Sequence, residues 1–284
     1  MLPRAGVDRI IDAALEEDVS LGDITTDGLV PPELTGKASF VVKADGVLAG
    51  MEVAIRVFQR VDPALQGQVL VGDGSPVAPR VVVGEATGPV AAILRAERTA
   101  LNLLTRMSGI ATETARYVRA VEGLPCHILD TRKTAPGLRL LDKYAVRMGG
   151  GRNHRYHLGD GVLVKDNHWE ALKRAGITLA QGLEGLRGRV HHLIRIQVEV
   201  KDMAELSEAI GAGADVLLLD NMSPEEMAVA VKEVGGRLPL EASGGISLET
   251  VRRVAQSGVD FISIGALTHS PGALDISLEL EYQA

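Results

Sequence analysis

Charged and polar residues follow the short apolar runs in the second half of this 284-residue chain. The segments in question are Asp130-Thr131-Arg132-Lys133, Lys165-Asp166-Asn167-His168, Glu199, Asp220-Asn221, Glu241-Ala242-Ser243-Gly244-Gly245 and Gly265-Ala266. One charged residue after a strand is usually only solvated, but six such strand ends indicate a common mouth around one ligand. Cations beside carboxylates are suited to an anionic ligand that also carries a metal. The pattern therefore predicts a phosphorylated sugar bound with a divalent cation.

The segment 132–155 is strongly basic in a chain whose formal net charge is −7, since it holds seven Lys or Arg and the single acid Asp142. We expect Arg139, Lys143 and Arg147, spaced four residues apart, to form a solvated helix face. Three glycines, 149–151, then precede Arg152-Asn153-His154-Arg155. Glycines allow close backbone approach, and the residues after them offer donors suited to planar carboxylates. This end of the segment is therefore a candidate anion site.

Two glycine-containing turns are candidates for binding phosphate. Ser243-Gly244-Gly245 comes just before an expected helix whose N-cap we assign to Ser247. Backbone N–H groups at a helix start attract anions. The second turn, Gly265-Ala266, follows the next expected strand, and the loops after the last two strands of a barrel often hold phosphate. Together the two turns favour a phosphate site.

Short apolar runs alternate with helical patterns from residue 127 onward. The expected strands are 128–130, 162–164, 194–200, 216–219, 238–240 and 261–264, and the clearest helices are 203–210, 225–234 and 248–256. This alternation predicts parallel strands joined by right-handed crossovers. Six strands are too few for the usual eight-stranded barrel of ~250 residues, so a doubly wound sheet is the competing architecture. The clustering of polar residues at the strand ends favours a barrel.

The first hundred residues have a mixed pattern that predicts a small α+β sandwich. Apolar residues at helical spacing indicate helices around 7–15, 53–61 and 88–107. Strands are expected at 37–42, 68–71 and 80–85, and the turn Asp45-Gly46 suggests a hairpin from the first of these to 47–49.

Composition excludes several classes of protein. The net negative charge and the 3% aromatic content argue against a general nucleic-acid binder. The single cysteine, Cys126, cannot form an intrachain disulfide, and we expect a buried, inert thiol. No apolar stretch approaches the ~20 residues that span a bilayer, and the N-terminus has no signal-peptide core. We therefore expect a cytoplasmic protein.

Several of these segments resemble the motifs of the quinolinate phosphoribosyltransferase family. The most specific is DTRKTAPGLRLLDKYAVRMGGGRNHRYHLGDGVLVKDNH, residues 130–168. Similar matches are EDVSLGDITT (17–26), ERTALNLLTRMSGIAT (97–112), LLLDNMSPEEM (217–227), LEASGGI (240–246) and ISIGALTHS (262–270). Two features depart from the family pattern: Gln197 stands where many members have a second glutamate, and the stretch 180–193 is idiosyncratic.

The resemblance implies an α/β protein with an N-terminal α/β sandwich and an incomplete, about six-stranded parallel α/β barrel. We place the sandwich at 1–108, with 267–284 packing back on it, and the barrel at 109–266. The resemblance also implies a homodimer in which one subunit's N-terminal region closes the partner's barrel mouth. The partners would otherwise be the small-molecule substrates, with no nucleic acid and no membrane.

The resemblance further implies the role of each site residue. Arg132, His154, Arg155 and Lys165 would line the quinolinate pocket, with Arg98 reaching in from the other subunit. Lys133 and Lys165 would contact phosphoribosyl pyrophosphate, and Glu199 and Asp220 would face the ribose and a Mg²⁺ ion. Ser243, Gly244, Gly245 and Gly265 would take phosphate, and Thr131 is a further candidate in the substrate site. Of these residues, Lys133, Lys165, Glu199 and Asp220 are the candidates for catalysis.

The expected reaction transfers phosphoribosyl to quinolinate with decarboxylation, a step of NAD biosynthesis that gives nicotinate mononucleotide. Two alternatives are weighed against it. One is a paralogue of the same fold associated with molybdenum transport, and the other is a non-catalytic barrel that binds a phosphorylated metabolite. The complete GGGRNHR and TRK patterns favour the transferase over the first. The pairing of Glu199 and Asp220 with so many cations favours it over the second.

Overall fold

The computed structural model describes residues 2–283 and divides into two compact units. The first unit comprises the chain up to Ala115 together with 133–151 and the segment from Ala266 onward. The second unit comprises Arg116–Arg132 and Arg152–Gly265. Each unit has its own sheet, so each is described by itself.

The first unit is built on a four-stranded antiparallel sheet with the order β12-β1-β5-β3. The strands are β1 (Thr35–Val42), β3 (Gln66–Val69), β5 (Val82–Pro89) and β12 (Ile276–Gln283), and a small ladder joins β2 (Gly46–Val47) to β4 (Pro76–Val77). The prediction of a hairpin at Asp45-Gly46 is therefore wrong, because β2 pairs with β4 rather than with β1. The last strand of the chain occupies one side of β1, and β5 occupies the other.

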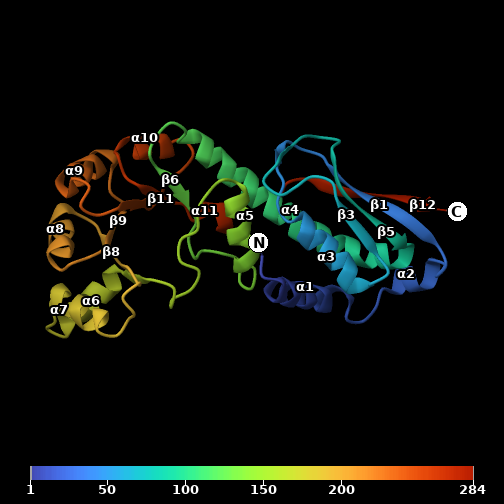
Figure 1. The fold of residues 1–284 in the computed structure, drawn as a ribbon, viewed down its shortest axis with the longest axis horizontal. Helices are drawn as coiled ribbons and strands as arrows, with labels where there is room; N and C mark the ends of the chain where they lie inside the picture. The colour runs from blue at the N-terminus through green and yellow to red at the C-terminus, as the bar shows by residue number, and fades with distance from the viewer. Residues whose placement is uncertain (1, 284) are drawn as a thin grey trace. The chain divides into compact units, whose positions relative to one another are not determined.

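Helices complete the first unit (Figure 1). They are α1 (Arg4–Val19), α2 (Ile24–Leu29), α3 (Met51–Val61), α4 (Val90–Ala120), α5 (Arg139–Met148) and α11 (Ala266–His269). Helix α3 packs on the sheet, where the rings of Phe40 and Phe58 meet edge to face at 5.6 Å. Helix α4 does not end near Met107 as expected, and its residues from Arg116 onward belong to the second unit.

The second unit contains a six-stranded parallel sheet with the order β6-β11-β10-β9-β8-β7. Its strands are β6 (His127–Leu129), β7 (Val162–Val164), β8 (Ile196–Val200), β9 (Val216–Asp220), β10 (Leu240–Ser243) and β11 (Phe261–Ser263). Strands β7 to β11 pair in chain order and β6 joins after β11, whereas a doubly wound sheet reverses its order at a switch point. No ladder joins β6 to β7 within residues 2–283. The sheet is therefore that of an incomplete barrel.

Helices connect the parallel strands of the second unit. They are α6 (Asp166–Arg174), α7 (Leu179–Arg187), α8 (Met203–Gly211), α9 (Pro224–Val234) and α10 (Val251–Gln256), and the idiosyncratic stretch 180–193 contains most of α7. Figure 1 shows α8, α9 and α10 outside the sheet. The strand residues Val198, Leu217, Leu219, Ala242 and Ile262 are fully buried, so they form the core that fixes the strand ends.

Three local expectations are wrong. Lys143 is fully buried, so Arg139, Lys143 and Arg147 do not form one solvated face. Strand β10 covers 240–243 rather than 238–240, which places Glu241 inside the strand, where it is buried. Helix α10 begins at Val251 after Thr250, because a turn occupies 247–250, so Ser247 is not its N-cap.

Candidate active site

The segment after the glycine run lies alongside the first barrel strand. Arg152 N donates to Ile128 O (2.8 Å), and Asp130 N donates to Arg152 O (3.2 Å). The fully buried Asp130 carboxylate then accepts hydrogen bonds from Asn153 Nδ2 (2.6 Å) and His154 N (2.8 Å). These contacts bring the residues that follow β6 together with 152–155. The two ends of the basic segment therefore lie close together.

The glycine run itself has a packing role. Gly149 and Gly151 approach helix α4 so closely that a Cβ at either position would collide with Ala111 or Thr114. Gly150 has φ of +86°, a left-handed conformation that favours glycine. The close approach that the sequence suggested is made to a helix of the same unit.

Two guanidinium groups lie near one another at this place. Arg155 is half-buried, and its Nη1 donates to Gly161 O (2.6 Å). Burial lowers the pKa of Arg155, and the positive charge of Arg132 lowers it further. The buried Nε of Arg132 has no hydrogen-bond partner within residues 2–283. Neighbouring guanidiniums repel each other unless an anion lies between them, so the pair is suited to a carboxylate ligand.

Glu199 and Asp220 lie at the carboxyl ends of the adjacent strands β8 and β9. Burial raises the pKa of Glu199, the negative charge of Asp220 raises it further, and the positive charge of Lys165 opposes the shift. Asp220 Oδ2 also accepts from Asn221 Nδ2 (2.9 Å). The three predicted residues are thus within electrostatic reach of one another. Two carboxylates beside a lysine can bind a divalent cation together with a phosphate group.

The carboxylate pair cannot hold such a cation alone. No group of three or more His, Cys, Asp or Glu residues in the described chain has the geometry of a metal site. Mg²⁺ requires about six oxygen ligands, so a ligand of this site would have to supply most of them.

The loop after β10 exposes backbone where phosphate binding is predicted. Ser243 O accepts from Asn221 N (2.9 Å), which joins this loop to the end of β9. Gly244 has φ of +98° and Gly245 has φ of +60°, and no atom lies within 4 Å of a Cβ built at Gly245. Gly265 follows β11, the neighbouring strand in the sheet. The two glycine turns therefore follow adjacent strands, although the α-helix expected after the first starts later.

Arg98 and Lys133 belong to the first unit, whereas the other candidate residues belong to the second. Arg98 is exposed on α4. Lys133 is also exposed, and its carbonyl accepts a hydrogen bond from Thr268 Oγ1 (2.9 Å). Thr131 lies between Asp130 and Arg132 in the second unit.

Gln197 and Glu241 are buried polar residues to which the sequence assigned no role in the site. His154 Nε2 lies 3.1 Å from Gln197 Oε1, and Gln197 Nε2 donates to Glu241 Oε2 (2.8 Å). Their spacing could have indicated that both side chains face the site, because residues i and i+2 of a strand share a face. Gln197 comes two residues before Glu199, and Glu241 comes two residues before Ser243.

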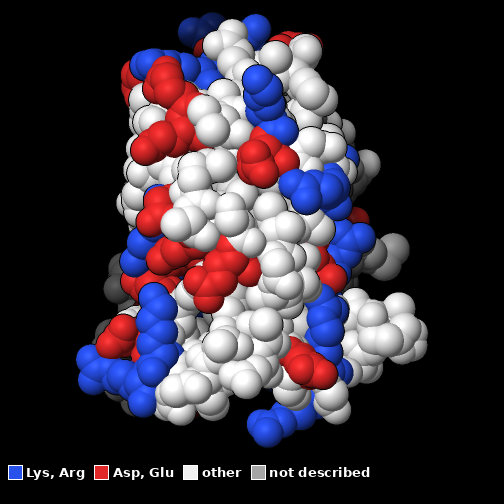
Figure 2. Space-filling model, turned by 90° about the vertical axis from the view of Figure 1, so that its left-hand side faces the viewer, with Lys and Arg blue, Asp and Glu red and all other residues white. Residues whose placement is uncertain are grey.

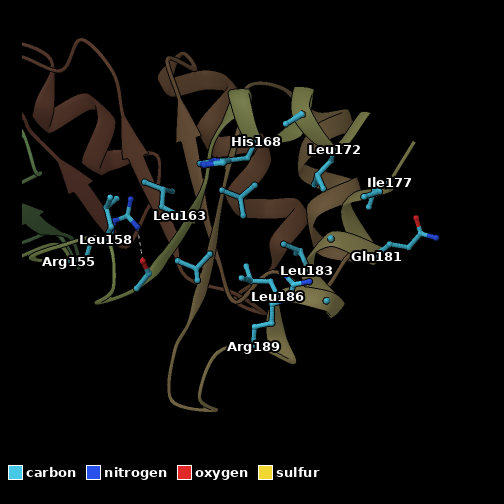
Figure 3. A pocket seen from close by; sticks show the side chains of 16 residues that line it. Arg155, Leu158, Leu163, His168, Leu172, Ile177, Gln181, Leu183, Leu186 and Arg189 are labelled. Carbon is cyan, nitrogen blue, oxygen red and sulfur yellow. Dashed lines mark hydrogen bonds between the residues drawn. The ribbon is translucent and has the colours of Figure 1, made fainter. Parts of the chain in front are cut away.

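An apolar pocket of about 670 Å³ in the second unit lies beside β7, α6 and α7. Leu163, Leu172, Leu183 and Leu186 line it, and Figure 3 shows Arg155 with its hydrogen bond to Gly161 at one end. Arg155 is the one predicted site residue in the lining. A dicarboxylate requires cations rather than leucines, so we do not assign this pocket as the substrate site.

The face of the second unit in Figure 2 carries acidic and basic side chains interspersed among uncharged residues. It shows no continuous basic surface of the kind that tracks a nucleic-acid backbone. Among the described residues, no helix is long and apolar enough to cross a membrane.

Known proteins and family models match this chain over almost its whole length. A family model described as "Quinolinate phosphoribosyl transferase, N-terminal domain" matches residues 23–108, and its C-terminal counterpart matches 110–279. A Synechocystis protein named probable nicotinate-nucleotide pyrophosphorylase [carboxylating] is 42% identical over 278 residues, 96% of this chain and 92% of the relative. A Bacillus subtilis protein of the same name is 40% identical over 93% of this chain and 90% of the relative.

Solved structures of similarly named proteins also match almost the whole chain. NadC from Streptococcus pyogenes superposes with a TM-score of 0.93 at 38% identity, and the match covers 100% of this chain and 99% of that one. The nicotinate-nucleotide pyrophosphorylase from Francisella tularensis superposes with a TM-score of 0.90 at 37% identity, covering 99% and 98%.

Proposed function

Because the chain belongs to the quinolinate phosphoribosyltransferase family, we propose that it transfers phosphoribosyl from phosphoribosyl pyrophosphate to quinolinate. The products are nicotinate mononucleotide, pyrophosphate and CO₂. The observation that carries the proposal is the proximity of Arg132 and Arg155 beside His154. Quinolinate has two adjacent carboxylates, and binding both demands several donors and positive charges held together.

The ring nitrogen of quinolinate attacks the anomeric carbon of the ribose as the bond from that carbon to pyrophosphate breaks. The transition state has oxocarbenium character, so Glu199 and Asp220 favour the positive charge that develops on the sugar. Lys133 and Lys165 neutralise charge on the departing pyrophosphate. Glu199 and Asp220 would hold a Mg²⁺ ion that arrives with phosphoribosyl pyrophosphate, and the ion would supply further charge neutralisation.

The adduct then loses the carboxylate next to the cationic ring nitrogen. The bond between the ring carbon and the carboxylate breaks, its electron pair stays on the ring carbon beside the positive nitrogen, and that carbon takes up a proton. The residues named above position the reactants, and no covalent nucleophile is required. In this proposal Ser243, Gly244, Gly245 and Gly265 hold phosphate, and Thr131 lies beside the substrate.

The same proposal includes the assembly of the protein. The active enzyme is a cytoplasmic homodimer in which Arg98 of one subunit acts at the other subunit's site. We assign the sandwich domain to residues 1–108 with 267–284 and the transferase domain to 109–266, although 109–115 and 133–151 pack with the first unit.

An assay with quinolinate, phosphoribosyl pyrophosphate and Mg²⁺ tests the reaction. Carboxyl-labelled quinolinate should release labelled CO₂ in step with nicotinate mononucleotide. Nicotinic acid lacks one carboxylate, so it would leave part of the cationic pocket unpaired and should react at least ~100-fold less efficiently. Comparable turnover of nicotinic acid and quinolinate would contradict the proposal.

A further inference from the structure

Two buried side chains and one half-buried side chain of the second unit form a hydrogen-bonded series. Glu241 and Gln197 are only 3% and 7% exposed. Gln197 Nε2 donates to Glu241 Oε2 (2.8 Å), and Gln197 Oε1 lies 3.1 Å from His154 Nε2. The residues come from β10, β8 and the segment after the glycine run. Each contact is within hydrogen-bonding distance, so the orientation of each group constrains the next.

The hydrogen bonds of this series determine which nitrogen of His154 carries the proton, starting from the carboxylate of Glu241. A carboxylate only accepts hydrogen bonds, so the side of the Gln197 amide that faces it must be the NH₂ group. The carbonyl oxygen of Gln197 then faces His154. Because that oxygen accepts as well, the nitrogen opposite it, Nε2, must carry a proton.

The other side of the ring leads to the same assignment. His154 Nδ1 lies 2.7 Å from the backbone nitrogen of Arg155, whose N–H donates to it. Nδ1 must therefore be the unprotonated nitrogen. Both ring nitrogens therefore face groups of the protein. Nε2 faces Gln197 Oε1 and lies 3.7 Å from Glu241 Oε2, both of which are acceptors, and Nδ1 accepts from the backbone of Arg155.

We propose that Gln197 and Glu241 are positioning residues that hold His154 as the Nε2–H tautomer, so that its Nδ1 anchors the backbone of Arg155. Through that anchor His154 contributes to binding the dicarboxylate by positioning Arg155. The role in binding quinolinate rests on the proposed function. The assignment of the tautomer depends only on the hydrogen bonds of His154.

Arg155 needs such an anchor. Its guanidinium lies near the like charge of Arg132 and is partly desolvated, and its Nη1 donates a hydrogen bond to Gly161 O. Repulsion between the two cations favours conformations that separate them. A backbone held by His154 limits that separation before the substrate binds, which reduces the ordering needed on binding.

Nuclear magnetic resonance on ¹⁵N-histidine-labelled protein tests the tautomer without substrate. His154→Gln identifies the His154 signals among the seven histidines. Two-bond correlations should show a neutral ring protonated at Nε2, and this proton should be observed directly because its hydrogen bond to Gln197 slows its exchange with water. An Nδ1–H tautomer, or a ring protonated on both nitrogens at pH ~7.5, would overturn the proposal.

A pair of variants at Glu241 separates hydrogen bonding from charge. Glu241→Gln keeps an acceptor for Gln197 and should keep the Nε2–H signal. Glu241→Met removes the acceptor, and Gln197→Met removes the contact with His154, so both should lose the slowly exchanging proton. If Glu241→Gln loses the signal as Glu241→Met does, the acceptor role is wrong. Should Glu241→Met not fold, Gln197→Met and the wild-type spectrum still decide the question.

Kinetics then test the positioning role. Gln197→Met should raise KM for quinolinate about tenfold, the equivalent of one lost hydrogen bond, while kcat and KM for phosphoribosyl pyrophosphate change less than about twofold. The last measurement controls for disturbance of Glu199, two residues away. An unchanged KM for quinolinate would overturn the positioning role. A wild-type protein that has the Nε2–H tautomer but no activity on quinolinate would instead refute the proposed function alone.

Discussion

Arg106 and Asp142 are joined by two parallel hydrogen bonds of 2.9 Å, from Nε to Oδ1 and from Nη2 to Oδ2. The Asp142 carboxylate is fully buried and also accepts from Ala135 N (3.1 Å). Arg106 Nη2 donates in addition to Thr268 O (3.1 Å), and Thr268 Oγ1 donates to Lys133 O. This network therefore ties the loop that carries Lys133 to helices α4, α5 and α11 of the first unit.

Replacing Asp142 by Asn should destabilise the protein by about 2–4 kcal/mol, because Arg106 loses its buried counter-charge. The loop that carries Lys133 also loosens, so activity should fall even where the protein remains folded. Urea denaturation and turnover measure the two effects. Asp12→Asn is the matched control, since Asp12 forms an exposed ion pair with Arg60 and should cost under about 1 kcal/mol. Equal losses in the two variants would contradict the role of Asp142.

Replacing Glu199 by Gln should stabilise the substrate-free protein while abolishing turnover. Burial and the charge of Asp220 raise the pKa of Glu199 in the folded protein, so its ionisation favours the unfolded chain. Removing that charge should raise Tm by roughly 1–3 °C at about pH 7.5. Thermal unfolding by circular dichroism measures the change, and Glu249→Gln serves as an exposed control.

The gain from Glu199→Gln should depend on pH in one direction. Below the unfolded value of 4.5 the carboxyl is protonated in both states, so the penalty is absent and the two proteins should have the same Tm. The penalty appears as pH rises through the raised folded-state pKa. A gain that is constant from acid to neutral pH would show that packing, not charge, is its cause.

The sequence predicted the barrel strands well because parallel strands buried on both faces form continuous apolar runs. The strand ends also lie close to where the sequence placed them, since the carboxyl ends of parallel strands meet at one edge of the sheet. That the residues at these ends bind one ligand stays a prediction. The sandwich was harder to predict, because β1 pairs with β12, whose residues lie more than two hundred positions later in the chain. Nothing near Asp45-Gly46 could reveal that partner.

The burial and the hydrogen-bond partners of several polar residues were also not predicted from the sequence. The periodic spacing of Arg139, Lys143 and Arg147 indicates a charged face, yet Lys143 is buried and Asp142 beside it pairs with Arg106, 36 residues earlier. Likewise, the pairing of Gln197 with Glu241 depends on strand order in the sheet. Local spacing shows which residues share a face, but it does not show which distant residue completes a hydrogen bond.

Cys126 should react slowly with thiol reagents in the folded protein. Burial raises the pKa of its thiol to about 11, and the charge of Asp260 adds to the shift. At pH 8 about 0.1% of the thiol is therefore ionised, and its burial also restricts access. Reaction with an aromatic disulfide reagent should be complete within seconds in urea and take hours without it. Rapid reaction of the folded protein would show that Cys126 is accessible.

Mg²⁺ should bind weakly until phosphoribosyl pyrophosphate is present. Glu199 and Asp220 supply two carboxylates, which leave most of an octahedral shell to substrate oxygens and water. Calorimetry should therefore detect no stoichiometric Mg²⁺ binding below about 1 mM without substrate, and binding at least ~10-fold tighter with it. Asp220→Asn should weaken the second titration and leave the first unchanged. Tight Mg²⁺ binding to the substrate-free protein would contradict the proposed site.

The shared active site predicts that two inactive variants restore each other. Arg98→Ala and Lys133→Ala should each be nearly inactive, since both residues are proposed to contact substrate. In a mixed dimer one site then carries both defects and the other carries neither, provided that Arg98 acts at the partner's site. Equal co-expression makes half of the dimers mixed, so about a quarter of wild-type activity should return.

The alternative arrangement gives a different result in the same experiment. If Arg98 acted within its own subunit, every site of a mixed dimer would carry one defect, and no activity would return. Two different affinity tags, purified in sequence, isolate the mixed dimers, which should then have about half of wild-type turnover. Arg119→Ala, at the end of the same helix, is the control for substitutions on α4 and should stay active alone. Isolated mixed dimers without activity would rule out the shared site, because each subunit would then have to supply its own arginine.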